Sequence, residues 1–391
     1  PIAIQAREEG FKGLILPKSN AREAAIVSDL EVLGAENLLG VIDFLDKEKP
    51  IIPEVIDTRK EFYDGVQQLE ADFSDVKGQE NIKRALEIAA AGGHNAIMIG
   101  PPGSGKTMLA KRLAGILPPL SLHEALETTK IHSVAGRMQN NASLMTSRPF
   151  RSPHHTISDV ALVGGGVNPQ PGEISLSHNG VLFLDELPEF KRTVLEVMRQ
   201  PLEDRVVTIS RAKFTIDYPA SFMLVASMNP CPCGFYNHPE KECLCSPGVV
   251  QKYLNKISGP LLDRIDLHVE VTPVSFDELT KKIPTESSEK VRERVVEARL
   301  LQESRFQDNK GVHCNAQMTT KQLQQHCQLS KESQSLLKAA MEQLELSARA
   351  YARILKVART IADLEGGEKV TSEHISEAIQ YRSLDREGWA G

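Results

Sequence analysis

The sequence has no apolar run that approaches the ~20 residues needed to span a bilayer. It shows no signal peptide, no long repeat and no low-complexity tract, although it opens so abruptly that we expect upstream sequence. Six cysteines in 391 residues do not resemble a disulfide scaffold. We therefore expect a soluble, cytoplasmic protein with room for two or three domains. The net charge of -6 neither favours nor excludes a nucleic-acid partner, because only local charge matters for gripping a polyanion.

The most informative stretch, residues 100–107, reads GPPGSGKT and fits the phosphate-loop pattern. It lies between an apolar run over 96–99, typical of a buried strand, and a helical run over 108–117. Glycines let backbone N–H groups and the helix N-terminus face a polyphosphate. Lys106 would reach the β- and γ-phosphates, and the Thr107 hydroxyl would hold magnesium. We expect nucleotide contacts from Gly100, Pro101, Pro102, Gly103, Ser104, Gly105, Lys106, Thr107 and Met108.

A second apolar strand, residues 181–184, ends in Asp185 and Glu186. Many strands end in acidic residues, so this pair alone is a weak signal. In a chain that also has a phosphate loop, the pair indicates the second half of an ATP site. Asp185 would orient the magnesium shell, and Glu186 would polarise the attacking water. A third strand over 222–226 leads to Asn229, whose amide could hydrogen-bond that water. The alternative for Asn229 is a turn-forming residue before proline.

Two arginine positions complete this predicted site. Arg264 lies between a helix and a strand, where it could project into a neighbouring subunit's γ-phosphate as an arginine finger in trans. Such a finger requires a ring of head-to-tail subunits. A local pair with Asp263 or Asp266 is the alternative.

A helix that opens near Ser347 carries the second position. Arg349 or Arg353 could reach down from this helical lid onto the nucleotide, and we prefer Arg349 because it lies at the helix start. Two solvated helix arginines remain the alternative.

Together these features resemble the AAA+ ATPases, and three strings resemble the magnesium-chelatase-like group known as YifB or ComM. The strings are RPFRSPHH at 148–155, GEISLSHNGVLFLDEL at 172–187 and NPCPCG at 229–234. The resemblance implies an α/β fold: an AAA+ core of parallel sheet flanked by helices, with a C-terminal helical lid. It also implies a homo-hexameric helicase that uses ATP and Mg²⁺ to drive branch migration of DNA during natural transformation.

The same resemblance gives the expected domain organisation. Residues 1–50 would be the C-terminal part of a Lon-protease-like α/β domain, without a serine–lysine pair that would support proteolysis. Residues 51–74 read as a linker, 75–274 as the ATPase core and 275–391 as the lid. Between Thr107 and Asp185 we expect the insert that the magnesium-chelatase and replicative-helicase branch of AAA+ proteins carries within helix 2. Residues 156–172 would form a projecting loop of this insert.

The resemblance identifies residues 206–217 as a hairpin that faces the central pore. Arg211 and Lys213 at its tip could bind DNA phosphates, and copies around a ring would multiply a weak contact. A solvated charged turn is the alternative. Few aromatics lie near the tip, so base stacking would contribute little.

Four clustered cysteines follow the third strand. Cys231, Cys233, Cys243 and Cys245 form two C-x-C pairs that could place four thiolates around a structural zinc ion, bracing the loop after Asn229. His238 could replace one cysteine, and reduced thiols in a loop are the alternative.

The main hypothesis is therefore an ATP-driven motor that translocates on single-stranded or branched DNA. A protein-remodelling ATPase, like the magnesium-chelatase motor subunit or a chaperone, would share every ATP-site residue. The pore distinguishes the two, because pulling polypeptide usually relies on an aromatic pore residue and none stands out here. An ATP-dependent protease is the third and weakest reading.

Overall fold

The computed structural model describes residues 1–58, 62, 72–138, 143–166, 169–211, 214–236, 238, 240–274, 285–309 and 311–382. It divides into two compact units. The first contains residues 1–68 and 119–148, and the second contains residues 69–118 and 149–391. Among the described helices, none has the length and apolar composition needed to cross a membrane.

In its described residues, the first unit contains a two-stranded parallel sheet with four helices. Its elements are α1 (Ile2–Glu8), β1 (Gly13–Pro17), α2 (Lys18–Ala24), β2 (Glu31–Ala35), α3 (Leu38–Leu45) and α7 (Leu122–Val134). Helix α2 begins directly after Pro17. Helix α3 buries no residue, and Leu38, Leu39 and Leu45 are exposed.

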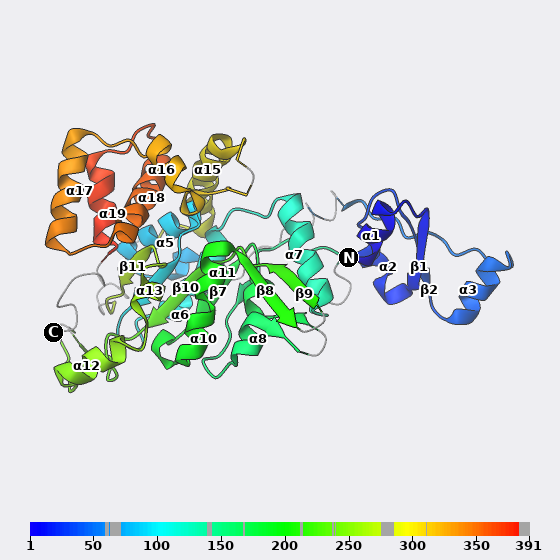
Figure 1. Cartoon of the computed structure of the whole chain (residues 1–391), viewed down its shortest axis with the longest axis horizontal. Coiled ribbons are helices and arrows are strands. Elements are labelled where there is room, and N and C mark those ends of the chain that lie inside the picture. Colours follow the sequence, from blue (N-terminus) through cyan, green and yellow to red (C-terminus); the bar gives the residue numbers. More distant parts are fainter. Residues whose placement is uncertain are drawn as a thin grey trace. The chain divides into compact units, whose positions relative to one another are not determined.

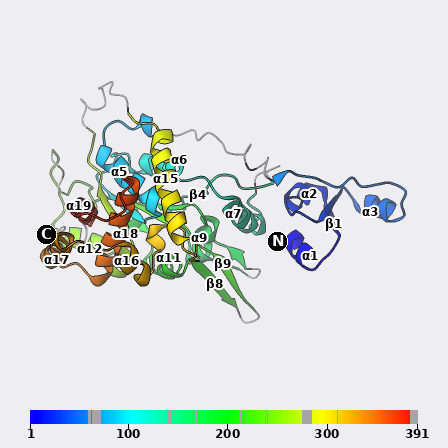
Figure 2. The ribbon, with the colours of Figure 1, turned by 90° about the horizontal axis from the view of Figure 1, so that it is seen from above.

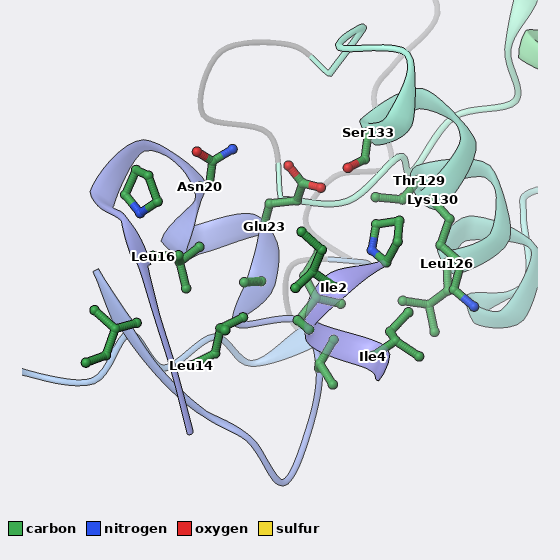
Figure 3. Close-up of a pocket in the computed structure, with 17 residues that line it drawn as sticks. Ile2, Ile4, Leu14, Leu16, Asn20, Glu23, Leu126, Thr129, Lys130 and Ser133 are labelled. Carbon is green, nitrogen blue, oxygen red and sulfur yellow. The ribbon is translucent and has the colours of Figure 1, made fainter. Parts of the chain in front are cut away.

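A cavity of about 490 Å³ lies inside this first unit (Figure 3). Its lining is mainly apolar, with Ile2, Leu14 and Leu16 on one side and Leu126 from α7 on the other. Glu23 and Lys130 are its charged lining residues. None of the residues predicted to bind nucleotide lines it.

The second unit is built on a five-stranded parallel sheet in the order β11-β3-β10-β7-β4. The strands are β3 (Ala96–Ile99), β4 (Phe150–Arg151), β7 (Val181–Leu184), β10 (Met223–Met228) and β11 (Leu267–Glu270). β3, β7 and β10 are buried along their whole length, as expected for apolar strands covered on both faces. The predicted α/β class is confirmed.

Side chains of alternate strand residues enter two cores, one on each face of the sheet. Met98 belongs to a core shared with α5, α6 and the C-terminal helices, whereas Ile97 belongs to a core shared with α8 to α13. The flanking helices are α5 (Glu80–Gly92), α6 (Lys106–Ile116), α8 (Asp159–Val163), α9 (Glu173–Leu176), α10 (Arg192–Val197), α11 (Arg199–Asp204), α12 (Pro247–Leu254) and α13 (Gly259–Leu262). Short 3-10 turns are η1 (Phe73–Asp75) and η2 (Leu187–Glu189).

The C-terminal region is helical, as expected, and its later helices gather at one end of the second unit (Figure 1). It comprises α15 (Ser288–Phe306), η3 (Asn315–Gln317), α16 (Thr320–His326), α17 (Lys331–Gln343), α18 (Ala348–Leu364) and α19 (Ser372–Gln380). Ser347 caps α18 by accepting the backbone N–H of Ala350, which fixes where this helix begins.

Two features interrupt the strand–helix alternation. β8 (Val206–Arg211) and β9 (Phe214–Pro219) form the predicted antiparallel hairpin, which extends away from the sheet (Figure 2). The segment 156–172, expected to be a projecting loop, instead contains α8 and a short pair, β5 (Gly164–Gly165) with β6 (Gln170–Pro171). Leu162 explains the difference, because its side chain is fully buried in the core and holds α8 against the sheet.

A buried polar cluster joins α18 to the start of β11. Asp266 pairs with Arg353 at 3.0 Å and with His94 at 3.3 Å. Burial alone would raise the pKa of Asp266, but Arg353 and His94 hold it well below its usual range. Nearby, burial lowers the pKa of Lys356 to about 8, and Arg353 adds to the effect.

We expect Lys356→Met to raise the free energy of unfolding at pH 7 by on the order of 1–3 kcal/mol, because the variant buries no ammonium. The pKa of Lys356 is about 8 in the folded chain, against an ordinary value of 10.5 for a lysine in water. Between about pH 8 and pH 10.5 the unfolded chain binds more protons than the folded chain, so the stability of the wild type rises with pH. The difference in the free energy of unfolding between Lys356→Met and the wild type therefore shrinks as pH rises. Denaturant titrations at pH 7 and pH 10 check this. An equal difference at both pH values would contradict it.

Candidate nucleotide-binding site

The phosphate loop joins β3 to α6 at the carboxyl edge of the sheet. Gly105 is the residue before α6, and its φ of +89° is a left-handed conformation that favours glycine. At Gly100 a Cβ atom would lie 2.3 Å from the carbonyl oxygen of Val271, so only glycine fits this close approach. The loop therefore takes the narrow turn that aims the N-terminus of α6 at an anion.

Lys106 is the first residue of α6 and points back over the loop. Its ammonium donates to the carbonyl oxygens of Gly100 at 2.7 Å and Pro101 at 2.9 Å, and to the amide oxygen of Asn229 at 3.2 Å. Burial lowers the pKa of Lys106, while Asp185 and Glu186 act in the opposite direction. The structure thus brings together the predicted phosphate-binding lysine and the predicted sensor residue.

The predicted magnesium ligands also meet. The Thr107 hydroxyl donates to a carboxylate oxygen of Asp185 at 2.7 Å, across the ends of α6 and β7. The other Asp185 oxygen accepts from the Ser227 hydroxyl. A hydroxyl and a carboxylate in contact are hard oxygen ligands of the kind Mg²⁺ takes beside nucleotide phosphates, so the residues fit the ion.

Glu186 lies next to Asp185 in a sparsely populated backbone conformation, with φ +55°. Its carboxylate is exposed and lies 3.9 Å from Nδ1 of His155. His155 is held by His154, whose ring centre is 4.1 Å away, and by the edge of Phe190. An exposed acid on a constrained backbone at this edge is suited to polarise water.

Sequence reasoning missed two of these partners. Ser227 bonds Asp185 and also accepts the backbone N–H of Glu186 at 3.3 Å. It lies two residues before Asn229 on β10, and this alternation could have indicated that both side chains leave the same face. His155 lies in the string at 148–155, and no local pattern connects it to Glu186.

The arginine expected to act as a finger lies at the opposite edge of the sheet. Leu267 pairs with Ala96, and Glu270 pairs with Ile99, so β11 and β3 run side by side. The phosphate loop follows the end of β3, whereas Arg264 precedes the start of β11. Four strand residues, about 13 Å, separate the two edges.

The Arg264 side chain is 8% exposed and pairs with Glu203 at 2.6 Å. Neither expected local partner, Asp263 or Asp266, forms that pair. Its Nε atom is buried and has no hydrogen-bond partner among the described residues. To reach a nucleotide, Arg264 must leave Glu203.

The lid arginines lie at this same edge. Arg349 is 3.5 Å from Asp263, and Arg353 pairs with the buried Asp266. Asn95, which precedes β3, donates to both Asp266 and the carbonyl oxygen of Arg264. The structure therefore does not bring Arg349 to this chain's own Lys106, because the sheet lies between them.

The four clustered cysteines come together, with all four sulfur atoms within 4.8 Å of one another. Cys231 Sγ lies 3.3 Å from Cys233 and 3.7 Å from Cys243, and Cys233 lies 3.6 Å from Cys243. Four thiolates around zinc at ~2.3 Å would be about 3.8 Å apart, whereas a disulfide would need about 2.05 Å. The cluster fits a tetrahedral metal site. His238 is not part of it.

The residues predicted to contact DNA cannot be placed. Arg211 ends β8 and its side chain is outside the described residues, as is the whole of Lys213. In the string at 148–155, Arg151 forms a bidentate pair with Glu173, with distances of 2.6 and 2.7 Å.

Comparison with known proteins agrees with this geometry. The family model "Magnesium chelatase, subunit ChlI" matches residues 72–279, and the model of its C-terminal domain matches residues 285–382. The chain is 45% identical over 387 residues to "Competence protein ComM" of Haemophilus influenzae, covering 98% of this chain and 74% of the relative. It is 45% identical over 391 residues to "Uncharacterized protein YifB" of Escherichia coli, covering 99% and 74%.

A more distant likeness covers less of the chain. The "Magnesium-chelatase 38 kDa subunit" of Rhodobacter capsulatus is 26% identical over 177 residues, which is 40% of this chain and 50% of the relative. The phosphate loop, the acidic strand end and the parallel sheet, together with these matches, lead to one conclusion: the chain belongs to the ComM/YifB family of magnesium-chelatase-like AAA+ ATPases.

Proposed function

We propose that this ATPase is a ring-shaped motor that translocates on DNA and promotes branch migration in homologous recombination during natural transformation. The observation that carries the motor part is the contact of Lys106 with Asn229, beside the contact of Thr107 with Asp185. These pairs gather the groups that bind a triphosphate, its metal ion and the attacking water. The recombination part rests on likeness to a protein described as a competence protein.

In this proposal each ATP lies between two chains. One chain supplies Lys106 and Glu186, and its neighbour supplies the edge that carries Arg264 and Arg349. A head-to-tail contact of this kind closes into a ring, and we propose a homo-hexamer. Arg264 would exchange its Glu203 partner for the γ-phosphate, so the pair would act as a resting position.

Each residue then has a separate task. The Lys106 ammonium stabilises charge on the β- and γ-phosphates, and Glu186 orients and polarises the attacking water. Asn229 holds Lys106 and faces the same water. Thr107 and Asp185 would hold Mg²⁺, which would supply positive charge beside the phosphate oxygens.

The hairpin of β8 and β9 would hold the DNA. Its antiparallel register extends to Arg211 opposite Phe214, and Lys213 lies between these two residues in the sequence. Two cations per chain, repeated around a ring, give a phosphate-binding collar without base readout. A protein-remodelling ATPase with the same ATP site is the alternative, and it needs no cations at the tip.

The four-cysteine cluster would bind one structural Zn²⁺ per chain. Its closed set of four sulfur ligands leaves no position for substrate, which favours a structural ion over a catalytic one.

Residues 1–50 would be part of a Lon-protease-like domain, followed by a linker over 51–74. The exposed apolar side chains of α3 support this, because they require cover from further structure.

Lys106→Ala should abolish nucleotide binding, whereas Glu186→Gln should bind ATP with wild-type affinity and lower turnover by ~10²–10⁴-fold, because only water activation is lost. Binding of a fluorescent ATP analogue and phosphate release measure the two effects. Glu189→Gln is the matched control, since this nearby exposed acid pairs with Lys256 and should leave both values unchanged. Normal turnover in Glu186→Gln would remove Glu186 from this role.

Single-stranded or branched DNA should stimulate ATP turnover severalfold in the wild type and hardly at all in Arg211→Ala with Lys213→Ala, because the variant lacks both tip cations. Lys331→Ala with Lys338→Ala, two exposed lysines of α17, controls for charge and should behave as wild type. An assembled wild-type ring whose turnover ignores DNA would favour the protein-remodelling alternative.

A further inference from the structure

The segment 231–245, which carries the four cysteines and which we call the cysteine loop, contacts the phosphate loop directly. Gly234 follows Cys233 and has a φ of +84°. A Cβ atom at Gly234 would lie 2.4 Å from Cδ of Pro102, so the backbone of the cysteine loop packs against the proline ring. A cavity of about 90 Å³ adjoins this contact, between Gly100 and Pro101 on one side and Gly234 and Tyr236 on the other. The cysteine loop is therefore one wall of the phosphate loop's surroundings.

The cysteine loop is also continuous with the sensor strand. β10 ends at Met228, whose carbonyl oxygen accepts the backbone N–H of Gly100 at 3.2 Å. Asn229, which accepts from Lys106, lies only two residues before Cys231. Both ends of the phosphate loop are thus held by residues that lead directly into the first cysteine.

Helix α12 holds this segment from the other side. Val250 packs against Cys231, and both are fully buried. Tyr253, one turn further, lies close enough to the backbone of Asn229 to influence the pKa of its own hydroxyl. The four thiols therefore lie between α12 and the turn that carries the sensor residue.

Other contacts among the described residues of the cysteine loop are local, because the backbone N–H groups of Glu240 and Lys241 donate to Nδ1 of His238 and Lys241 lies over Phe235. Cys233, Cys243 and Cys245 are only partly buried, and Leu244 between the last two is 87% exposed. Few apolar contacts mean low local stability. A metal ion that ties four side chains to one point would supply the missing constraint.

We propose that metal occupancy of the four-cysteine site controls the ATP site: bound Zn²⁺ holds Gly234 against Pro102 and Asn229 against Lys106. Without the ion, the loop moves away, the phosphate loop loses its wall and Lys106 loses its amide partner. The proposal rests on the ATPase and the zinc site proposed above. It makes zinc a requirement of nucleotide binding and not only of folding.

The experiment uses the full chain with Mg²⁺ present throughout. Zinc content is measured before and after treatment with a zinc-selective chelator, alongside the Kd of a fluorescent ATP analogue and the rate of ATP turnover. We expect one zinc per chain, and a Kd that rises at least tenfold after stripping and recovers with one equivalent of Zn²⁺. Substitution by Co²⁺ should give the visible absorption of a tetrahedral thiolate site.

Gly234→Ala separates metal binding from its effect, because it keeps all four cysteines while it disturbs the contact with Pro102 and strains the backbone at a φ of +84°. It should retain one zinc, yet bind the ATP analogue about tenfold more weakly. Gly311→Ala is the matched control for the backbone strain, since this glycine also has a φ of +84° and a Cβ there meets nothing within 4 Å. The control should lose a similar amount of melting temperature and keep the wild-type Kd.

The outcomes are distinguishable. Equal Kd and turnover in stripped and loaded protein would overturn the control of the ATP site and leave the zinc assignment standing. Absence of metal and of a Co²⁺ signal would overturn the zinc assignment itself. A zinc-loaded wild type that binds no nucleotide would overturn the ATPase mechanism instead.

Discussion

The parallel pairing of β3 with β11 is the constraint on which the rest depends. It directs the carboxyl ends of both strands to one edge of the sheet. The phosphate loop after Ile99 therefore lies at this edge, and the Arg264 turn before Leu267 lies at the opposite edge. A change of rotamer cannot carry the Arg264 side chain past the buried strands to the phosphate loop. A site that used both Lys106 and Arg264 would therefore have to be made by two chains, and this is the basis of the proposed ring. In that proposal the reaction would depend on assembly, because an isolated chain would hold only half of the site.

The two edges are not independent. Asn95 precedes β3 and binds the Arg264 turn, while its side-chain oxygen accepts the backbone N–H of Leu224 at the start of β10. β10 carries Asn229 at its other end. Strand β10 thus connects the edge that we propose serves a neighbour to the edge proposed to hold this chain's own nucleotide. At that second edge the strand continues into the cysteine loop. A shift of β10 would therefore move the proposed metal site.

Local patterns in the sequence predicted the parts of the site that are local in structure. The phosphate loop needs glycines at particular positions within eight residues. The apolar strand that ends in Asp185 and Glu186 can also be recognised from its own sequence, without knowledge of the strands beside it. The cysteine spacing likewise predicted the cluster. The edge on which Arg349 lies could not be predicted, because it depends on how α18 packs against the start of β11. His155 and Leu162 were missed for the same reason: their roles come from contacts with residues distant in the sequence.

Mixing of inactive subunits tests the central claim most directly. Lys106→Ala and Arg264→Ala chains should each be nearly inactive, but a 1:1 mixture should recover roughly a quarter of wild-type turnover, because random assembly places intact Lys106 beside a neighbour's intact Arg264 at about that fraction of contacts. Mixing either variant with the double variant should recover nothing. A mixture as inactive as its components, although both variants assemble, would contradict a nucleotide site shared between two chains.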